Sequence, residues 1–383
     1  MWFFTEEHKL LKKSVRDFAQ SVLGPKIDEL DEKEGYDRTY FTKMADLGLL
    51  GITTAEEYGG TQMGCVAATI AMEELGAVDA STALSYLAHT ILTVNNIATS
   101  ASDAQKKKYL PKLVSGEWIG GMGMTEPGAG SDALAMRTRA EKKGKKYILN
   151  GSKMFITNAV MGDVFYVYAR TGDGRKDIST FIVESSFPGF KMGKKLKKMG
   201  MRASPTGELI FENCEVPAEN LVGQEGGSVA HMLKNLDIER ITISGISLGI
   251  ARASIETAVK YAKERSQFGR PIADFQMIQA MLADAQAAYE AAAHYTYNIA
   301  KAWDEGLLDS NEASRASSAK VKLFAAPMAT KVALDAIQIL GGYGYIKEFP
   351  VERYMRDAKL VEIGAGTNEM LRVITARSML GDL

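Results

Sequence analysis

The sequence predicts an α+β fold in which a β domain lies between two helical domains. Apolar residues recur at helical spacing over roughly the first 116 positions. Short strand-like runs separated by Gly, Pro and Asn turns follow, and the remainder is Ala-rich and helical. This order is not the strand–helix alternation that builds a parallel α/β sheet. We expect an N-terminal helical domain at 1–117, a middle antiparallel β-barrel or sandwich domain at 118–226 and a C-terminal four-helix bundle at 227–383.

Five helices are expected in the N-terminal domain. The first follows a Thr5 cap and keeps its apolar residues on one face until Pro25 stops it. The segment 80–97 has no charged residue, but its many Ser, Thr, Asn and His residues favour a buried helix over a membrane span. The other three are expected at about 38–49, 66–75 and 103–116.

The middle and C-terminal domains differ in their residue patterns, which predict strands in the first and long helices in the second. Runs of β-branched and aromatic residues predict strands at 137–140, 147–149, 164–168, 179–183 and 208–211. Long apolar helical patterns with short loops, typical of an antiparallel bundle, predict helices at 228–265, 273–306, 311–340 and 367–380.

Composition narrows the classes of function. The 383 residues, 46% hydrophobic and 24% charged, suit a globular protein of two or three domains. A net charge of −1 argues against a nucleic-acid-binding surface. The two cysteines and four histidines lack metal-ligand spacing, so we expect no metal site. Without a targeting peptide after Met1, we expect a cytoplasmic protein, or a mitochondrial-matrix protein only if a transit peptide has been removed.

Three segments can hold a cofactor. Residues 123–132 (G-M-T-E-P-G-A-G-S-D) match G-x-G-x-x-A from Gly128, but Pro127 and the strand-like sequence that follows disfavour a nicotinamide Rossmann site. At 150–158 (N-G-S-K-M-F-I-T-N), an aromatic and a Thr end a strand and could be core residues. At 265–270 (R-S-Q-F-G-R), arginines suit a pyrophosphate because the guanidinium donates two parallel hydrogen bonds.

Two further segments have both a functional and a structural interpretation. Small residues at 364–366 let a flat ligand approach the backbone, and Thr367 or Asn368 then caps the last helix; alternatively, this is a plain loop before a helix. The run of five lysines between 191 and 198 is either a solvated strand and turn or a contact for the phosphates of a coenzyme A tail.

These segments, in this order, resemble the acyl-CoA dehydrogenase family, which binds FAD and whose T-E-P-x-A-G-S-D signature matches 125–132. The resemblance covers the chain from the first helix to the last. It implies an N-terminal helical, middle β and C-terminal helical domain. It also implies FAD contacts from Met122, Met124, Thr125, Gly130, Ser131, Phe155, Ile156, Thr157, Thr367, Asn368 and Glu369.

The resemblance also implies an oligomer. In the family, the ADP half of the FAD belongs to the neighbouring subunit, in a homotetramer built as a dimer of dimers. The positions that correspond to this contact here are Arg265, Phe268, Gln276, Gln338, Ile339, Gly341 and Gly342. From the residues alone, 338–342 could equally be a helix C-terminus with a Gly cap.

The catalytic base is displaced from its usual position. Most of the family has a glutamate where this chain has Ala365. From the residues alone, D-I-E-R at 237–240 could be a solvated cluster, with Glu362 and Glu369 as other nearby acids. The isovaleryl-CoA branch, however, pairs G-A-G-T with D-L-E-R, and its helical Glu is the base. That resemblance implies Glu239 as base and substrate contacts from Ser131, Asp237, Arg240, Ala365 and Gly366.

The implied activity is FAD-dependent α,β-dehydrogenation of a short, branched acyl-CoA, with electrons passed to electron-transferring flavoprotein. A second carboxylate on the substrate is disfavoured because no Arg or Lys occurs between Ala71 and Gln105. One departure from the branch is Ala230, where a Tyr is usual, and one from much of the family is Phe155, where many relatives have Trp. The alternatives are a cyclic or straight short-chain acyl-CoA substrate, a flavin oxidase, a non-catalytic FAD-binding protein and an NAD-linked Rossmann dehydrogenase.

Overall fold

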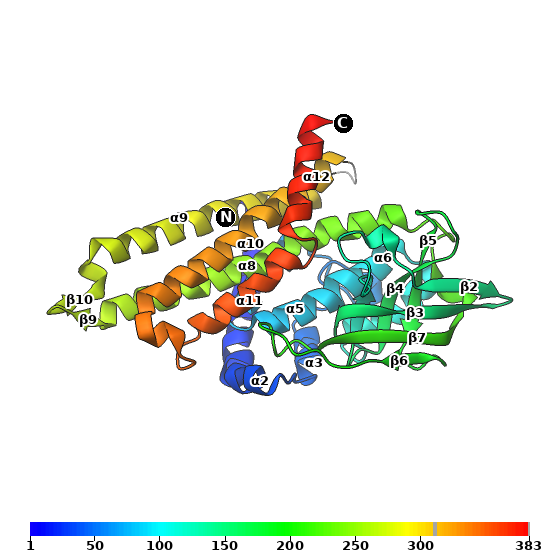
Figure 1. Cartoon of the computed structure of the whole chain (residues 1–383), viewed down its shortest axis with the longest axis horizontal. Coiled ribbons are helices and arrows are strands. Elements are labelled where there is room, and N and C mark those ends of the chain that lie inside the picture. The colour runs from blue at the N-terminus through cyan, green and yellow to red at the C-terminus, as the bar shows by residue number, and fades with distance from the viewer. Residues whose placement is uncertain (309–311, 382–383) are drawn as a thin grey trace.

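The computed structural model describes residues 1–308 and 312–381, and the predicted fold class is confirmed. Figure 1 shows an elongated molecule, with the β domain at one end, the N-terminal helices near the middle and long C-terminal helices extending to the other end. The sheet packs at the N-terminal end of the long helix α8 (Val229–Glu264), at His231 and Asn235, whereas the N-terminal helices pack against its middle, at Gly245 and Gly249.

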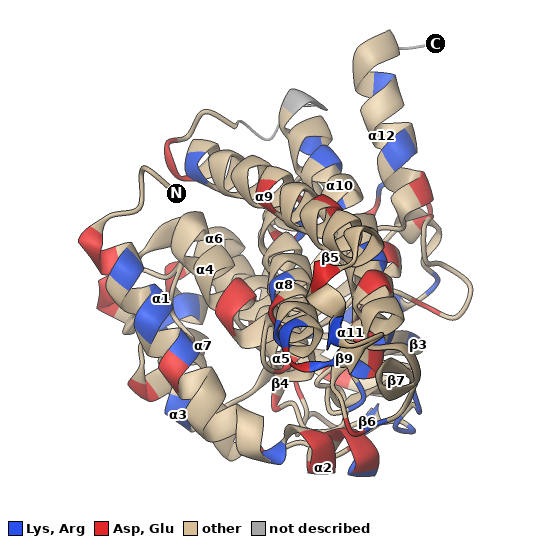
Figure 2. Ribbon diagram, turned by 90° about the vertical axis from the view of Figure 1, so that its left-hand side faces the viewer, with Lys and Arg blue, Asp and Glu red and all other residues tan. Residues whose placement is uncertain are grey.

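The N-terminal domain contains one helix more than we predicted between the first helix and position 38. Thr5 begins α1 as expected: its hydroxyl accepts from the His8 amide at 3.2 Å. Lys, Arg, Asp and Glu are interspersed along α1, as Figure 2 shows. The predicted 80–97 helix is buried but changes to π-helical geometry at Thr90–Asn95. The helices are α1 (Glu6–Phe18), α2 (Ile27–Lys33), α3 (Thr39–Asp46), α4 (Gly64–Gly76), α5 (Ala80–His89), α6 (Asn96–Ser100) and α7 (Asp103–Val114).

The β domain is a mixed sheet with the order β6-β7-β3-β2-β4-β5-β8. The prediction of an entirely antiparallel sheet was wrong at two pairings: β1 runs parallel to β4, and β2 meets β4 in parallel at one pair. The β2–β3 hairpin intervenes in the chain and supplies the crossover that parallel strands need. The strands are β1 (Gly120–Gly123), β2 (Arg139–Lys143), β3 (Lys146–Thr157), β4 (Val164–Arg170), β5 (Ile178–Glu184), β6 (Phe190–Met192), β7 (Thr206–Pro217) and β8 (Leu221–Val222).

The bundle is formed by α8, α9 (Gln276–Asp304), α10 (Glu312–Leu340) and α11 (Val351–Ile363). The helix predicted at 367–380 is present as α12 (Asn368–Leu380), but its place in the bundle was predicted wrongly: α12 contacts α10 and projects away from the bundle in Figure 1, and α11 is the fourth helix. Helix α11 escaped prediction because it buries Arg353 and Asp357 beside its apolar residues, which obscures the apolar period. The predicted start of α10 at Asn311 lies outside the described residues. A β9–β10 hairpin (Ser266–Gln267 and Arg270–Pro271) joins α8 to α9.

The segment 314–345 is apolar and long enough, by length and composition alone, to cross a membrane. Half of its most apolar window is buried inside the protein. It consists of most of α10 and the 3₁₀ turn Gly341–Tyr345, and α10 packs against α8, α9, α11 and α12. Core helices of globular proteins meet the same length and composition criteria.

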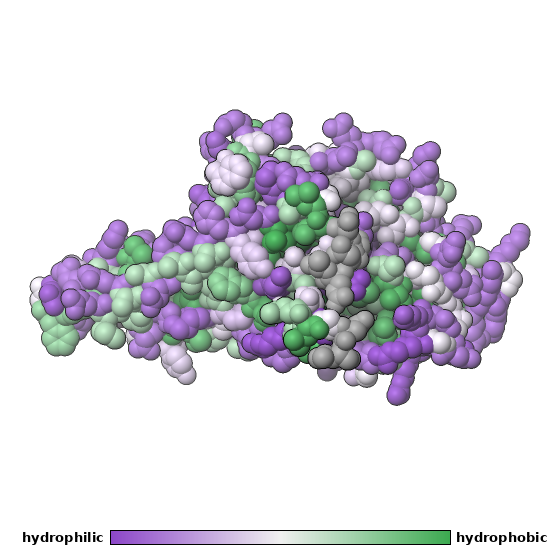
Figure 3. All heavy atoms as spheres, turned by 90° about the horizontal axis from the view of Figure 1, so that it is seen from above, coloured by the Kyte–Doolittle hydropathy of each residue, from purple (hydrophilic) through white to green (hydrophobic). Residues whose placement is uncertain are grey.

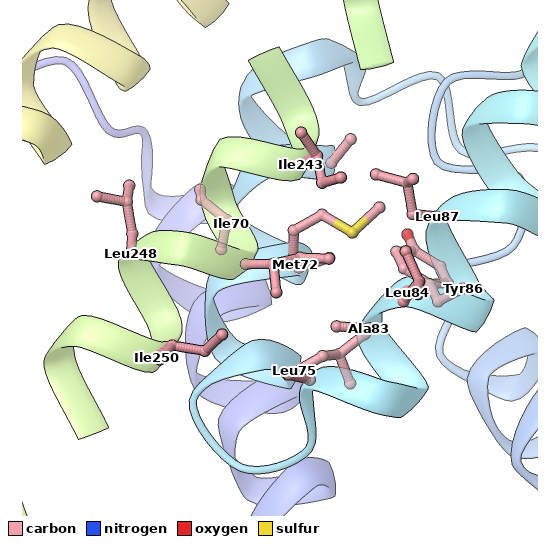
Figure 4. Packing of buried hydrophobic residues seen from close by; sticks show 14 of the residues in the cluster. Ile70, Met72, Leu75, Ala83, Leu84, Tyr86, Leu87, Ile243, Leu248 and Ile250 are labelled. Carbon is pink, nitrogen blue, oxygen red and sulfur yellow. The ribbon is translucent and has the colours of Figure 1, made fainter. Parts of the chain in front are cut away.

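Helix α8 is held against α4 by a close backbone contact. A Cβ added to Gly249 would lie 2.3 Å from the Glu73 carbonyl oxygen. Beside it, Arg252 pairs with the buried Glu73 and Glu74 at 3.2 and 2.8 Å. Figure 4 shows apolar side chains of α4, α5 and α8, among them Met72, Leu87 and Ile243, packed against one another. This contact fixes the position of α8 and of the polar residues on its N-terminal half.

Candidate active site

Glu239 is a buried carboxyl group on α8. Its side chain is 6% exposed, and among the described residues its Oε2 has no hydrogen-bond partner. Burial raises its pKa to about 7, although the charges of Arg240 and Lys322 act to lower it. A buried carboxyl with a free oxygen and a pKa near neutrality is suited to accept a proton from a bound molecule.

The turn at 364–367 lies against α8 beside this group. Ala365 and Gly366 adopt the left-handed region, with φ of 56° and 90°. Nε of Arg240 donates to the Ala365 carbonyl at 3.3 Å. Thr367 is the cap of α12, because its hydroxyl accepts from the Met370 amide at 3.3 Å. The predicted D-I-E-R and G-A-G-T segments, about 125 positions apart, therefore meet.

Asp237 and Arg240 form a buried ion pair, with Nη1 of Arg240 3.1 Å from Oδ1 of Asp237. The Ser318 hydroxyl of α10 donates to the same oxygen at 2.8 Å, whereas Oδ2 of Asp237 has no partner in the part of the chain that the structure describes. The interpretation of this cluster as solvated is wrong, since all of its side chains are buried. Oδ2 remains free to accept a hydrogen bond from a ligand.

The two other acidic residues near the turn, Glu362 and Glu369, are more exposed than Glu239 and have ion-pair partners. Glu362 accepts hydrogen bonds from the Thr330 hydroxyl at 2.8 Å and from Nδ2 of the Asn368 side chain at 3.3 Å, and it pairs with Lys359 at 3.3 Å. Glu369 is exposed and pairs with Arg372, and hydrogen bonds near the start of α12 lower its pKa. Neither acid has the dry surroundings of Glu239, so the geometry favours Glu239 as the proton acceptor.

The two predicted flavin segments come together at β1 and β3. The Met154 amide donates to the Thr125 carbonyl at 2.8 Å, which joins the end of β3 to the loop after β1. Phe155 has a left-handed φ of 60° and is 66% exposed, which leaves its ring accessible to a flat ligand. Of the other residues predicted to contact FAD in these segments, Met124 and Ile156 are buried, Met122, Thr125 and Thr157 are partly buried, and Gly130 and Ser131 are exposed.

A buried ion pair that we did not predict supports this edge. Nζ of Lys153 lies 2.8 Å from Oε1 of Glu126 and donates to the Met124 carbonyl at 3.1 Å. Glu126 also accepts from the amides of Arg137 and Thr138, at 2.6 and 2.9 Å. The only sequence signal was a lysine within a strand, and its burial could not be foreseen from that pattern.

The residues predicted to contact the ADP half of the FAD lie at the end of the bundle farthest from Glu239. A cavity of about 670 Å³ is lined by Arg265, Phe268, Ile339, Gly341 and Gly342, together with aromatic residues that include Tyr343. Gln276 and Gln338 are exposed on the neighbouring ends of α9 and α10. Arg265 follows Glu239 by 26 positions along α8, which is about 39 Å of helix. One chain therefore does not bring this cavity and Glu239 together.

Three of the five lysines between 191 and 198 bind the protein itself. Lys191 pairs with Glu212 at 2.6 Å, Lys195 donates to the Glu34 carbonyl and Lys198 donates to the Ser204 carbonyl. This arrangement favours the interpretation of the run as a surface strand and turn. In addition, no cluster of three His, Cys, Asp or Glu side chains suited to a metal ion occurs within residues 1–308 and 312–381.

Comparisons with known proteins give matches to a single family along nearly the whole chain. Models of the acyl-CoA dehydrogenase N-terminal, middle and C-terminal domains match residues 5–117, 121–214 and 226–380. A mitochondrial isovaleryl-CoA dehydrogenase of Pongo abelii is 44% identical over 99% of this chain and 90% of its own. An acyl-CoA dehydrogenase of Bacillus subtilis is 44% identical over 98% of this chain and 99% of its own.

A solved structure agrees with these relatives. A chain from a study of the electron transferring flavoprotein of Acidaminococcus fermentans superposes with a TM-score of 0.96 at 42% identity, covering 100% of both chains. The sequence matches and this structural likeness span all three domains. The chain therefore belongs to the acyl-CoA dehydrogenase family.

Proposed function

We propose that the protein is an FAD-dependent dehydrogenase of a short, branched acyl-CoA, with Glu239 as the base. The observation that supports this most directly is the buried carboxyl of Glu239 with one free oxygen, beside a turn that has alanine at position 365. Similarity to an isovaleryl-CoA dehydrogenase favours a branched acyl group.

Glu239 would remove the proton from the α-carbon of the acyl thioester. This proton is weakly acidic, so the base needs a pKa close to the working pH, and burial supplies that. FAD, when bound, supplies the acceptor for the hydride that leaves the β-carbon. The methyl side chain of Ala365 leaves room beside the base that a carboxylate at that position would fill, and the space suits a branched carbon.

The substrate contacts stay predictions that the geometry supports. Oδ2 of Asp237 is free, while Arg240 is held by both Asp237 and the turn. The helices nearby present Leu84 and Leu87 of α5 and Ile243 of α8, which are apolar (Figure 4). An apolar surrounding favours a short hydrocarbon acyl group over one with a second carboxylate.

The chain's residues fit an FAD in two places. The exposed Phe155 and the backbone after β1 would meet the flavin, and the 670 Å³ cavity beside Arg265 would take the ADP half. Because the cavity beside Arg265 lies about 39 Å along α8 from Glu239, next to which a flavin would have to react, we propose that each cofactor contacts two subunits. The apolar surface supports this: Figure 3 shows apolar side chains along α9, where Met277 is 76% exposed. A homotetramer is the assembly we expect.

The acceptor of the electrons remains a proposal, electron-transferring flavoprotein, supported by the structural likeness described above. A flavin oxidase on the same fold is the competing function. The two are separated by reducing the enzyme anaerobically with substrate and adding air in a stopped-flow instrument. Rapid reoxidation by oxygen would favour the oxidase. The cellular location also stays a prediction, since one relative is mitochondrial and the other bacterial.

The central test is flavin bleaching by a panel of isovaleryl-, isobutyryl-, 2-methylbutyryl-, butyryl- and cyclic acyl-CoA compounds. We expect the fastest bleaching with a branched substrate. Glu239→Gln should retain FAD and ligand binding but lose turnover by about 10²–10⁴-fold, because no other base replaces it. Near-normal turnover of Glu239→Gln would exclude Glu239 as the base. Failure of every acyl-CoA to bleach a yellow protein would indicate a non-catalytic FAD-binding protein.

A further inference from the structure

We propose that Lys322 is a positioning residue that holds the 364–367 turn and supplies the cation next to Glu239. The proposal rests on the proposed function, because it assigns Lys322 a role toward that base. Lys322 lies on α10, more than 80 positions after Glu239, and no motif of the sequence indicated it.

The turn is held from two sides. Nζ of Lys322 donates to the Gly366 carbonyl at 2.8 Å and lies 3.4 Å from Oδ1 of Asn368. Nε of Arg240 donates to the preceding carbonyl, that of Ala365. Since a trans peptide unit is planar, with its N–H opposite its carbonyl, these two bonds also set the direction of the Gly366 and Thr367 amides. Two cations from different helices therefore determine how the turn faces Glu239.

Lys322 is unusual in its burial. Its side chain is 0% exposed, and no carboxylate of the described residues lies within 4.0 Å of its Nζ. A buried cation without an ion-pair partner is costly in folding. A neutral side chain of similar length could fill the same volume, so a requirement for folding alone does not explain a lysine here. A role for the charge, directed at the neighbouring Glu239, does explain it.

The charged groups around Lys322 and Glu239 determine in which direction the pKa of Glu239 should change when Lys322 is replaced. Burial lowers the pKa of Lys322 to about 8, while the carboxylates of Glu239, Glu362 and Glu369 raise it. Among the described residues, Asp237 on α8, Tyr168 on β4 and Arg315 on α10 also interact electrostatically with Glu239 or Arg240. Lys322 and Arg240 are thus the cations that oppose the effect of burial on Glu239. Removing one of them should raise the pKa of Glu239, so that the base becomes active only at higher pH.

The test compares Lys322→Met, which keeps the volume and removes charge and donor, with Lys322→Gln, which keeps a donor. Lys331→Met is the matched control, since Lys331 is on the same helix but exposed and paired with Asp335. In both Lys322 variants, the acidic limb of the pH profile of kcat/KM should move to higher pH by roughly one pH unit or more. Lys322→Met should also lower kcat more than Lys322→Gln. The control should leave the profile unchanged.

A second readout does not depend on turnover. Infrared difference titration can follow the carboxyl band of Glu239, identified by its loss in Glu239→Gln, and this band should titrate at higher pH in Lys322→Met. An unshifted limb and band in a folded, FAD-containing variant would refute the role of Lys322 even if Glu239 is essential. Turnover that survives in Glu239→Gln would instead refute the proposed base. If Lys322→Met does not fold, the same measurements on Lys322→Gln decide the question.

Discussion

Removing the buried Lys153 should disrupt the flavin-facing edge of the β domain. Its ammonium group is fully buried, 2.8 Å from Glu126, and it donates to the Met124 carbonyl. Glu126 is 7% exposed and accepts hydrogen bonds from the backbone amides of Arg137 and Thr138. Burial acts to raise the pKa of Glu126, but Lys153 and these hydrogen bonds lower it on balance. In Lys153→Met, a buried carboxylate would therefore lose its only close cation among the described residues.

The magnitude follows from the burial of both partners. Leaving one member of a buried ion pair uncompensated destabilises a protein by about 3–5 kcal/mol. Lys146→Met is the matched control, because Lys146 lies on the same strand and pairs with Glu215 at 2.6 Å with both side chains partly exposed. Exposed pairs contribute about 0–1 kcal/mol. The double variant Lys153→Met with Glu126→Gln should recover part of the loss, since it also removes the unpaired charge.

Two measurements follow the effect. The free energy of unfolding from chemical denaturation should fall in Lys153→Met by several times more than in Lys146→Met. The FAD content of the purified protein, read from its flavin absorbance relative to protein, should fall as well, because Lys153 holds the Met124 carbonyl within the predicted flavin segment. If the free energy of unfolding of Lys153→Met is within about 1 kcal/mol of that of the parent and the variant keeps its FAD, then Lys153 does not organise this edge.

Two other substitutions test the base and the helix contact. The double variant Glu239→Gly with Ala365→Glu should turn over at least about tenfold faster than Glu239→Gly alone, most readily on straight-chain acyl-CoA, because the new carboxylate occupies the position usual in the family. A bleaching rate no higher than that of Glu239→Gly would contradict this. Gly249→Ala should lower the free energy of unfolding by about 1–3 kcal/mol, since its Cβ would lie 2.3 Å from the Glu73 carbonyl oxygen. Gly24→Ala is its control, because a Cβ there meets only ordinary contacts at 3.7 Å, and an equal loss in both variants would show that the α4–α8 contact is not special.

Local signals in the sequence were sufficient for part of the fold. The Thr5 and Thr367 caps could be predicted because a cap depends on side chains within three positions. The base could be assigned only through a family resemblance, since the periodicity around Glu239 is equally consistent with a solvated cluster. Its burial depends on what α8 packs against, which local patterns do not contain.

Long-range contacts account for what was missed. Ser318 and Lys322 reach the site from α10, about 80 positions after D-I-E-R. Helix α11 was overlooked because Arg353 and Asp357 are buried within it, and Asp357 accepts from the Met201 amide of the β domain. Charged residues at buried positions break the apolar pattern from which helices are predicted. Such residues are the ones that join one domain to another.

The position of the base on α8 has a structural consequence for the turn. A glutamate on the turn would depend on backbone that adopts left-handed φ at two successive residues, whereas Glu239 is anchored in a helix held by α4 and α10. Arg240 and Lys322 both donate to carbonyls of the turn and both act on the charge of Glu239. The same two cations thus align the turn with the base and moderate the pKa of the base. A change in either cation should therefore alter geometry and proton affinity together, which is why the proposed variants separate the donor from the charge.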